Sequence, residues 1–174
     1  MQISRPLALL LLVCCLIPSG PAEARDKWFG GGGIGLGFGS VDWVDISGLV
    51  GYRITPRLST GIRATYRSRE DGRFSRDVST TDYGASLFGR FRVGGPFYAQ
   101  LEYEHLSYEF IRPDLTTVRD EFNSVLVGGG LAHPLSPRVG LFATGLYNLS
   151  YEDDELRSPY DSPWIFRAGI SFSF

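Results

Sequence analysis

The sequence predicts an all-β fold, an eight-stranded antiparallel up-and-down transmembrane β-barrel, on three observations. An export signal precedes the main part of the chain, eight segments alternate apolar with small or polar residues, and their connections alternate in length. Alternation at period two gives a strand two distinct faces, whereas a helix needs a period near 3.6. The composition agrees, since 22 glycines in 174 residues are nearly twice the usual share of about 7 %.

Residues 1–24 are expected to be a cleaved signal peptide. Arg5 gives the positive start, residues 7–17 the apolar centre, and residues 22–24 a small-x-small cleavage site. The apolar run falls short of the roughly 18 residues of a membrane helix. The mature barrel domain is therefore expected at residues 25–174.

The signal also contains both cysteines, Cys14 and Cys15. A disulfide scaffold, a thiol enzyme and a Cys-based zinc site are thus not expected in the mature chain. Lipidation at Cys14 is disfavoured, because Val13 before it is not small and a better cleavage site follows. The net charge of −2 gives no indication of nucleic acid binding.

Eight strands follow in order, at residues 30–39, 44–54, 58–67, 82–92, 99–104, 124–131, 139–150 and 164–174. In the first, glycine fills every odd position from 31 to 39, opposite Ile34, Leu36 and Phe38. In the others one face is apolar: Val44, Ile46 and Val50; Leu58, Ile62 and Tyr66; Tyr83, Leu87 and Phe91; Ala99, Leu101 and Tyr103; Val125, Val127 and Leu131; Val139, Leu141 and Tyr147; Trp164, Phe166 and Ile170.

The connections alternate between tight turns and longer charged loops. The turns are residues 55–57, 93–96 and 133–138, and the loops are 68–79, 110–120 and 152–163, while the connection near residue 41 is short. Short turns at one end and long loops at the other are typical of outer-membrane barrels.

The alternative is a soluble lipocalin-like barrel, whose apolar face would point inward around a ligand. The membrane barrel is favoured because the second face carries many glycines and serines, which suit a crowded lumen better than a soluble surface. Eight strands enclose an interior that side chains just fill. The glycines of the first strand are expected to leave room for long arginines.

A lumen charge network is predicted on the polar face, in which Asp82, Glu102 and Glu104 pair with arginines, because buried charges need partners. Its members are Arg63, Arg67, Asp82, Arg90, Arg92, Glu102 and Glu104. We interpret it as a plug, with a narrow low-conductance channel as the alternative. Aromatic girdles are expected at both rims: Trp28, Tyr52, Phe97 and Phe172 at one, and Trp43, Tyr66, Tyr83 and Trp164 at the other.

With its signal peptide, eight alternating strands and the ending Ile170-Ser171-Phe172-Ser173-Phe174, the chain resembles the outer membrane protein A transmembrane domain and OmpX-like barrels. The resemblance implies a monomer in the bacterial outer membrane, in contact with lipid and lipopolysaccharide. It implies that Phe172 and Phe174 are read by the barrel-assembly machinery. It also implies a structural or surface-interaction role without enzymatic activity or a cofactor. Because the sequence stops at the barrel, a peptidoglycan-anchoring role is not carried over.

Three motifs point to other chemistry. Gly30, Gly32 and Gly35 match the spacing of a dinucleotide fingerprint, but no βαβ unit surrounds them. His105 and Ser107 lie on one strand face near the outer rim, and resemble the catalytic pair of outer-membrane lipid A deacylases. That family has an asparagine where Tyr108 stands and a downstream acidic residue for which we find no match, so a rim pair at the headgroup level is favoured.

The loop charges suggest surface contacts. Arg67, Arg69, Arg73 and Arg76 offer bidentate contacts to lipopolysaccharide phosphates. Glu152, Asp153, Asp154 and Glu155 offer hard oxygen ligands to a divalent cation. Their spacing matches no calcium loop, and a solvated acidic loop is the default interpretation.

Overall fold

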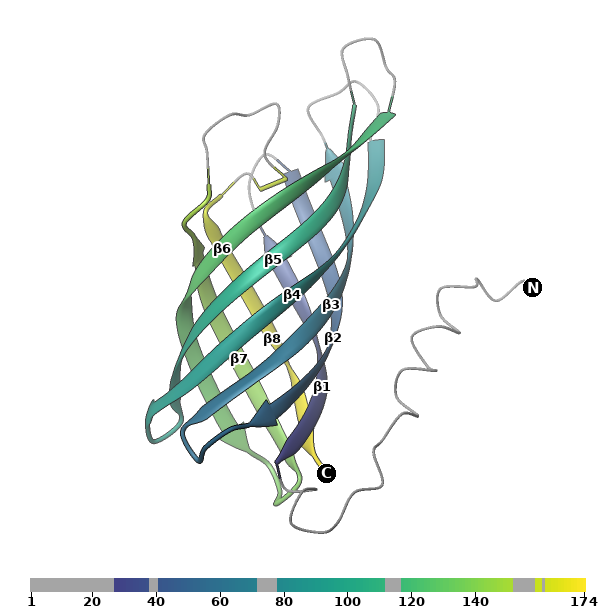
Figure 1. The fold of residues 1–174 in the computed structure, drawn as a ribbon. Coiled ribbons are helices and arrows are strands. Elements are labelled where there is room, and N and C mark those ends of the chain that lie inside the picture. The colour runs from purple at the N-terminus through teal and green to yellow at the C-terminus, as the bar shows by residue number, and fades with distance from the viewer. Residues whose placement is uncertain (1–26, 38–40, 72–77, 112–116, 152–158, 161) are drawn as a thin grey trace, which may run out of the picture.

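The computed structural model describes residues 27–37, 41–71, 78–111, 117–151, 159–160 and 162–174. These residues form a closed antiparallel barrel in which each strand pairs with the next and β8 returns to β1 (Figure 1). The strands are β1 (Trp28–Gly37), β2 (Val41–Arg53), β3 (Leu58–Asp71), β4 (Val78–Gly94), β5 (Phe97–Ile111), β6 (Thr117–Pro134), β7 (Val139–Asn148) and β8 (Trp164–Ser173). No helix that could span a membrane occurs among these residues.

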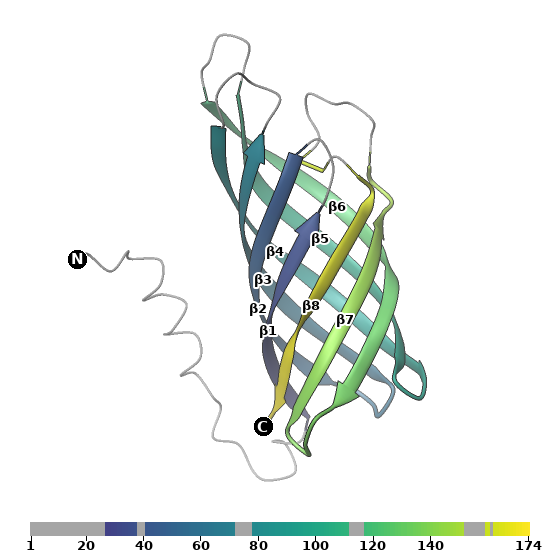
Figure 2. The same ribbon diagram turned by 180° about the vertical axis from the view of Figure 1, so that it is seen from behind.

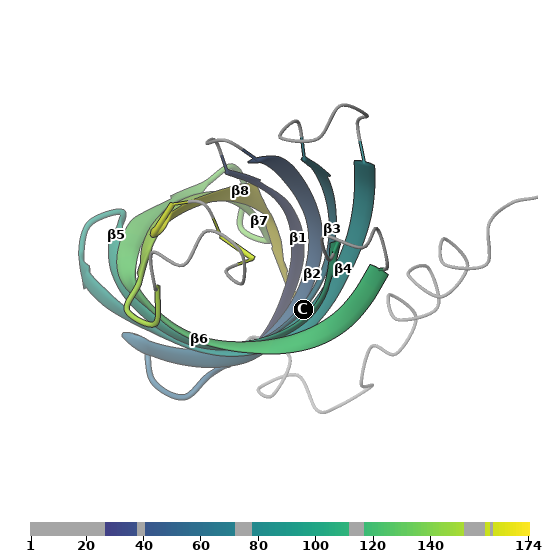
Figure 3. The same cartoon turned by 90° about the horizontal axis from the view of Figure 1, so that it is seen from above.

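The two ends of the barrel differ. The turns after β2, β4 and β6 lie at the same end as the C-terminus (Figure 2). The turn after β4 needs only Gly95 and Pro96, and Gly95 adopts a φ of 55°, which favours glycine. Viewed along the barrel from the opposite end, the strands form a closed ring (Figure 3). Closure leaves no sheet edge, so every strand pairs on both sides.

The outer surface of the barrel is apolar. Ile46, Ile62, Leu87, Leu101 and Phe166 each expose roughly half or more of their area, with Ile62 at 63 %. Their neighbours along each strand, at odd positions in β2 and β3 and at even positions in β4 and β5, are mostly buried. A soluble barrel would reverse this arrangement. The surface is instead that of a barrel solvated by hydrocarbon.

Two apolar clusters fill different levels of the lumen. The outer cluster lies toward the loop end and consists of Trp43, Leu126, Leu146, Tyr160 and Ile165, with Phe122 and Tyr151 against it. The inner cluster lies toward the turn end and consists of Phe29, Leu49, Phe88 and Phe142. Charged side chains contact both clusters, since Arg67 lies over the ring of Trp43 and Arg90 lies over the rings of Phe88 and Phe142.

Glycines make room for the rings of the inner cluster. A Cβ atom at Gly61 would lie 2.6 Å from Cζ of Phe88, and one at Gly169 would lie 2.7 Å from Cζ of Phe142. A Cβ atom at Gly51 would overlap the ring of Phe29. The expectation that glycines of the first strand accommodate arginines was therefore wrong in its detail. The side chains that these glycines meet are the rings of Phe29, Phe88 and Phe142, and Gly35 of the first strand meets the carboxylate of Asp45.

Several strands are longer than the alternation pattern predicted. β4 begins at Val78, and β5 and β6 leave only residues 112–116 between them. The strands continue into segments whose outward residues are charged, such as Arg119 and Glu121, so the apolar alternation ends before the strand pairing does.

One residue of the predicted aromatic girdles was also misplaced. Trp43 is 4 % exposed and points into the lumen, because its neighbour Val44 occupies the outward position.

Candidate functional site in the barrel lumen

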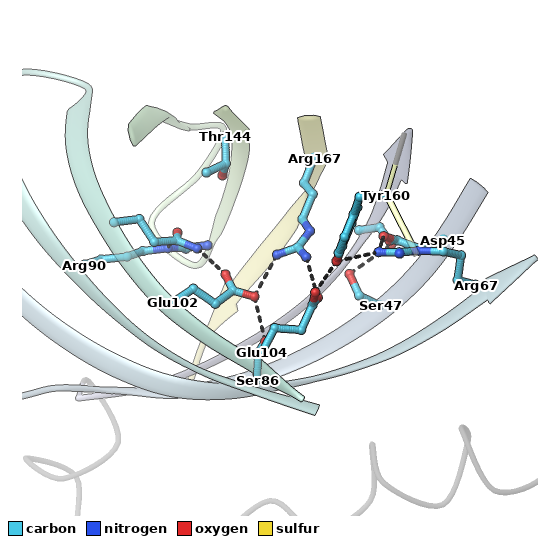
Figure 4. A network of polar contacts seen from close by, with 12 residues as sticks. Asp45, Ser47, Arg67, Ser86, Arg90, Glu102, Glu104, Thr144, Tyr160 and Arg167 are labelled. Carbon is cyan, nitrogen blue, oxygen red and sulfur yellow. Dashed lines mark hydrogen bonds and ion pairs between the residues drawn. The ribbon is translucent and has the colours of Figure 1, made fainter. Parts of the chain in front are cut away.

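The candidate site is the band of charged side chains between the two apolar clusters (Figure 4). Inward positions of β2, β3, β4, β5 and β8 supply it, since alternate residues of each strand face the lumen. Arg67, Glu102, Glu104 and Arg167 are each at most 3 % exposed. The site thus contains ionised groups that depend on one another for solvation.

Arg167 of β8 is the central cation. Its Nη1 donates to Oε1 of Glu102 at 2.7 Å, and its Nη2 donates to Oε1 of Glu104 at 2.9 Å. Figure 4 shows the guanidinium reaching between the two carboxylates. The planar fork of an arginine suits such a double contact, and charge-assisted hydrogen bonds are stronger than neutral ones. This contact ties β8 to β5 across the lumen.

Glu102 has further donors on the neighbouring strand β4 and on its own strand β5. Oγ of Ser86 donates to its Oε1 at 2.6 Å, and Nε2 of Gln100 donates to its Oε2 at 2.6 Å. Gln100 in turn accepts from Nε of Arg90 at 2.6 Å. Both oxygens of Glu102 are therefore engaged, and Arg90 reaches that carboxylate only through the amide of Gln100.

Tyr160 joins the outer part of the network. Its hydroxyl donates to Oε2 of Glu104 and accepts from Nη2 of Arg67, the latter at 3.2 Å. Burial raises the pKa of the Tyr160 phenol, so the hydroxyl keeps its proton and remains a donor. Because Tyr160 lies between β7 and β8, this contact inserts a residue of the last connection into the barrel.

Arg67 is held from three sides. Its Nη2 lies 3.7 Å from Oδ2 of Asp45. The guanidinium carbon lies 4.0 Å from the ring centroid of Trp43 and 4.7 Å from that of Tyr160. Cations over aromatic faces are stabilised most where water is excluded. The outer apolar cluster and the charge network therefore share residues and are expected to be lost together.

The structure brings together five of the seven predicted lumen residues as fully buried groups. Arg63, Arg67, Asp82, Glu102 and Glu104 are each at most 1 % exposed. Arg90 is partly exposed by area, and Arg92 is exposed. The placement of Arg92 in the lumen was wrong, because it lies next to the register shift between Arg92 and Gly94 at the turn end.

The predicted pairing was incomplete. Asp82 accepts from the backbone N–H of Glu109 at 3.1 Å. The cation bonded to Glu102 and Glu104 is Arg167, and the carboxylate beside Arg67 is Asp45. Alternation puts both residues on the polar face. Asp45 lies directly opposite Arg67 in the pairing of β2 with β3, whereas Arg167 reaches Glu102 and Glu104 only across the closed barrel. Tyr160 had no signal in the sequence, since it lies in a connection.

His105 and Ser107 lie on the outer face, as the register predicted. Nδ1 of His105 lies 2.9 Å from Oδ1 of Asn123, and its Nε2 lies 3.9 Å from Oε2 of Glu121. Ser107 accepts from Nη1 of Arg119 at 3.4 Å. That arginine also pairs with Glu109.

Other predicted sites fall partly or wholly outside the described residues. These are the acidic run Glu152, Asp153, Asp154 and Glu155, the residues Arg73 and Arg76, and the side chain of Arg69. Within the described part of the chain, no three His, Cys, Asp or Glu residues gather as a metal site. Phe172 and Phe174 are exposed at the turn end of β8, where assembly recognition remains a prediction.

The lumen, in its described part, contains two sets of ion pairs. Arg167 of β8 binds Glu102 and Glu104 of β5 across the barrel, and Arg67 of β3 lies beside Asp45 of the adjacent strand β2. A solute crossing the lumen would have to separate ion pairs in a low-dielectric interior, which costs several kcal/mol for each ion.

Comparisons with known proteins agree with this architecture. No protein-family model matches the sequence, and no curated protein matches it. Among solved structures, the N-terminal β-barrel domain of Pseudomonas aeruginosa OprF aligns with a TM-score of 0.57 at 16 % identity, covering 86 % of this chain and 98 % of that one. Neisserial surface protein A aligns with a TM-score of 0.53 at 16 % identity, covering 85 % and 96 %. The chain has the fold of the small eight-stranded barrels of bacterial outer membranes.

Proposed function

We propose that the chain is a monomeric, non-catalytic integral protein of a bacterial outer membrane with a structural or surface-interaction role. One observation carries the proposal: the Arg167 ion pairs lie buried in the lumen, inside an apolar exterior. Such a molecule is held in lipid by its surface, and we expect its paired lumen charges to oppose the passage of solutes. Contact with other molecules is then left to the loop end, with outer-leaflet lipopolysaccharide as the nearest partner.

The membrane part of the proposal is tested by fractionation and gel migration. The chain is expressed in a Gram-negative host, and outer membranes are extracted with mild detergent. We expect the protein in that fraction, shortened by the signal peptide, with different gel mobility before and after boiling. Removal of Phe174 should reduce insertion if the C-terminus is read during assembly. A chain found in the aqueous fraction without a mobility shift would overturn the proposal.

The role itself is tested by separating barrel from loops. In one variant residues 72–77, 112–116 and 152–158 are replaced by Gly-Ser segments, and in a matched variant the turn 135–138 is replaced. Cells lacking the gene are complemented with each, and sensitivity to bile salts and adhesion to surfaces are measured. Loss of a phenotype only in the loop variant supports surface interaction, and rescue by both variants supports a structural role. Failure of the wild-type gene to change either phenotype would refute both.

The hydrolase alternative rests on His105, whose ring is oriented by Asn123 on the lipid-facing side. Because Ser107 is engaged by Arg119 instead, we expect no hydrolysis. Lipid A from cells carrying wild type, His105→Ala or Ser107→Ala should give the same mass profile. A lipid A mass profile that wild type alters and either variant restores would establish the enzyme.

The channel alternative is tested by current recording in planar bilayers. Steady openings that are removed by Glu102→Gln would contradict the interpretation of the lumen as a plug.

A further inference from the structure

We propose that the turn end of the barrel binds the headgroups of anionic phospholipids, such as phosphatidylglycerol, in the periplasmic leaflet of the membrane. The inference rests on the proposed function, which places the short turns at the periplasmic side. The described cations of this end are Lys27, Arg53, Arg57, Arg92 and Arg138. Its segments 51–60, 89–98 and 130–141 contain no Asp or Glu. Among the described residues, the terminal carboxylate of Phe174 is the one acidic group at this end.

Two pairs of cations lie opposite each other on adjacent strands of the turn end. The backbone N–H of Arg92 donates to the carbonyl oxygen of Arg57 at 2.8 Å, and that of Arg53 donates to the carbonyl oxygen of Lys27 at 2.7 Å. Arg57 and Arg92 are exposed, and none of the ion pairs among the described residues includes either of them. Like charges directly opposite on neighbouring strands are destabilising. A phosphate group between Arg57 and Arg92 would relieve this repulsion and accept bidentate hydrogen bonds.

Exposed apolar side chains accompany these cations. Ile54, Val93 and Leu135 expose 52 %, 66 % and 57 % of their area, and each lies within three residues of an arginine in the sequence. A soluble acidic partner would neutralise the arginines, but it would gain nothing from the aliphatic side chains beside them. The headgroup region of a bilayer accepts both, because an arginine lays its aliphatic stem along apolar surface and keeps its guanidinium at the polar level. A lipid surface therefore fits this end better than a soluble acidic protein.

The charge of the turn end favours a lipid with net negative charge. At the opposite end, residues 109–121 and 151–163 contain more Asp and Glu than Arg. Before Lys27 the sequence adds Arg25 and Asp26, whose charges cancel. The positive excess is thus confined to the turn end. Each cation near an anionic membrane surface strengthens the attraction about fivefold, whereas a zwitterionic lipid offers no net charge.

The two ends of the barrel carry their own fluorescent reporters for a test. Trp28 at the turn end and Trp164 at the loop end are 37 % and 52 % exposed, whereas Trp43 is buried in the lumen. The refolded chain is inserted into phosphatidylcholine vesicles that contain brominated phosphatidylglycerol or, at the same mole fraction, brominated phosphatidylcholine. Bromine quenches a tryptophan that the lipid contacts. Trp164→Phe leaves Trp28 as the outward reporter, and Trp28→Phe leaves Trp164.

We expect phosphatidylglycerol to be preferred over phosphatidylcholine about fivefold at Trp28 and to show no preference at Trp164. High salt should weaken the preference at Trp28, because it screens charges at an exposed surface. Equal quenching of Trp28 by the two brominated lipids, or the same preference at both tryptophans, would overturn the inference.

Charge variants assign the preference to the turn end. In the Trp164→Phe background, the triple variant Lys27→Gln, Arg57→Gln, Arg92→Gln should lose it. The matched triple variant Arg73→Gln, Arg76→Gln, Arg112→Gln removes the same charge from the loops and should retain it. An unchanged preference in the turn-end variant would contradict the inference. Binding of a polyglutamate peptide to the turn end without any lipid preference would assign the surface to a soluble partner and also contradict it.

The outcomes separate this inference from the proposed function. A chain that does not insert into vesicles would refute the membrane protein itself, whereas an inserted chain without lipid preference refutes only the lipid site. Gel mobility before and after boiling shows whether each variant is folded. If the turn-end variant does not fold, the comparison of Trp28 with Trp164 in the otherwise unchanged chain decides the question.

Discussion

Arg167→Met is the most informative perturbation of the charge network. The substitution keeps most of the side-chain volume but leaves Glu102 and Glu104 without the cation that now donates to them at 2.7 and 2.9 Å. Hydrogen bonds to charged groups contribute about 1.5–3 kcal/mol each. Breaking a buried pair from one side costs about 3–5 kcal/mol. Both figures predict that the free energy of unfolding falls by about 3–5 kcal/mol.

The assay is urea unfolding of the refolded barrel in detergent micelles, with gel mobility and circular dichroism as independent readouts. The expected loss corresponds to an unfolding constant raised by roughly two to nearly four powers of ten. The triple variant Arg167→Met, Glu102→Gln, Glu104→Gln should recover part of the loss, because it removes the orphaned charges as well. A decrease below about 1 kcal/mol for Arg167→Met would refute the reasoning, since that is the range of solvent-exposed pairs.

Further perturbations test other layers of the lumen by the same assay. Tyr160→Phe removes the hydroxyl between Glu104 and Arg67 and should cost about 1–3 kcal/mol; an unchanged midpoint would mean that the last connection does not brace the barrel. Phe88→Ala opens the inner cluster and should cost about 3–5 kcal/mol, with no loss expected if that cluster is loosely packed. Gly61→Ala places a methyl group 2.4 Å from the backbone oxygen of Val50 and 2.6 Å from Cζ of Phe88, and should cost about 1–3 kcal/mol. The control Gly48→Ala meets nothing within 4 Å and should leave stability nearly unchanged.

The order and facing of the strands were predictable from the sequence because they depend on local geometry. Every second side chain of a strand points to the same face. Ile46, Ile62 and Leu87 could therefore be assigned to one face and Arg67 and Glu102 to the other before any pairing was known. The assignment of Trp43 to an outward girdle was wrong because it did not follow this rule. Alternation with the outward residue Val44 already places Trp43 on the inner face.

The ends of the strands were harder to predict. Outward residues near the loop end, such as Arg119 and Glu121, are charged, so apolar alternation no longer marks a strand there. Hydrogen bonding to the neighbouring strand continues beyond that point. Backbone groups of β5 and β6 form hydrogen bonds with each other whatever side chains they carry. The ends of these two strands are therefore defined only by the paired structure.

The sequence by itself determined a β-barrel with an apolar exterior and a charged interior, since both follow from alternation within each strand. Tertiary structure alone decided which charges meet. Arg167 reaches Glu102 and Glu104 because closure of β8 onto β1 sets the positions of strands across the lumen. Tyr160, from the last connection, contacts Glu104 and Arg67 inside the barrel. These contacts join residues far apart in the chain, and their geometry exists only once the ring has closed.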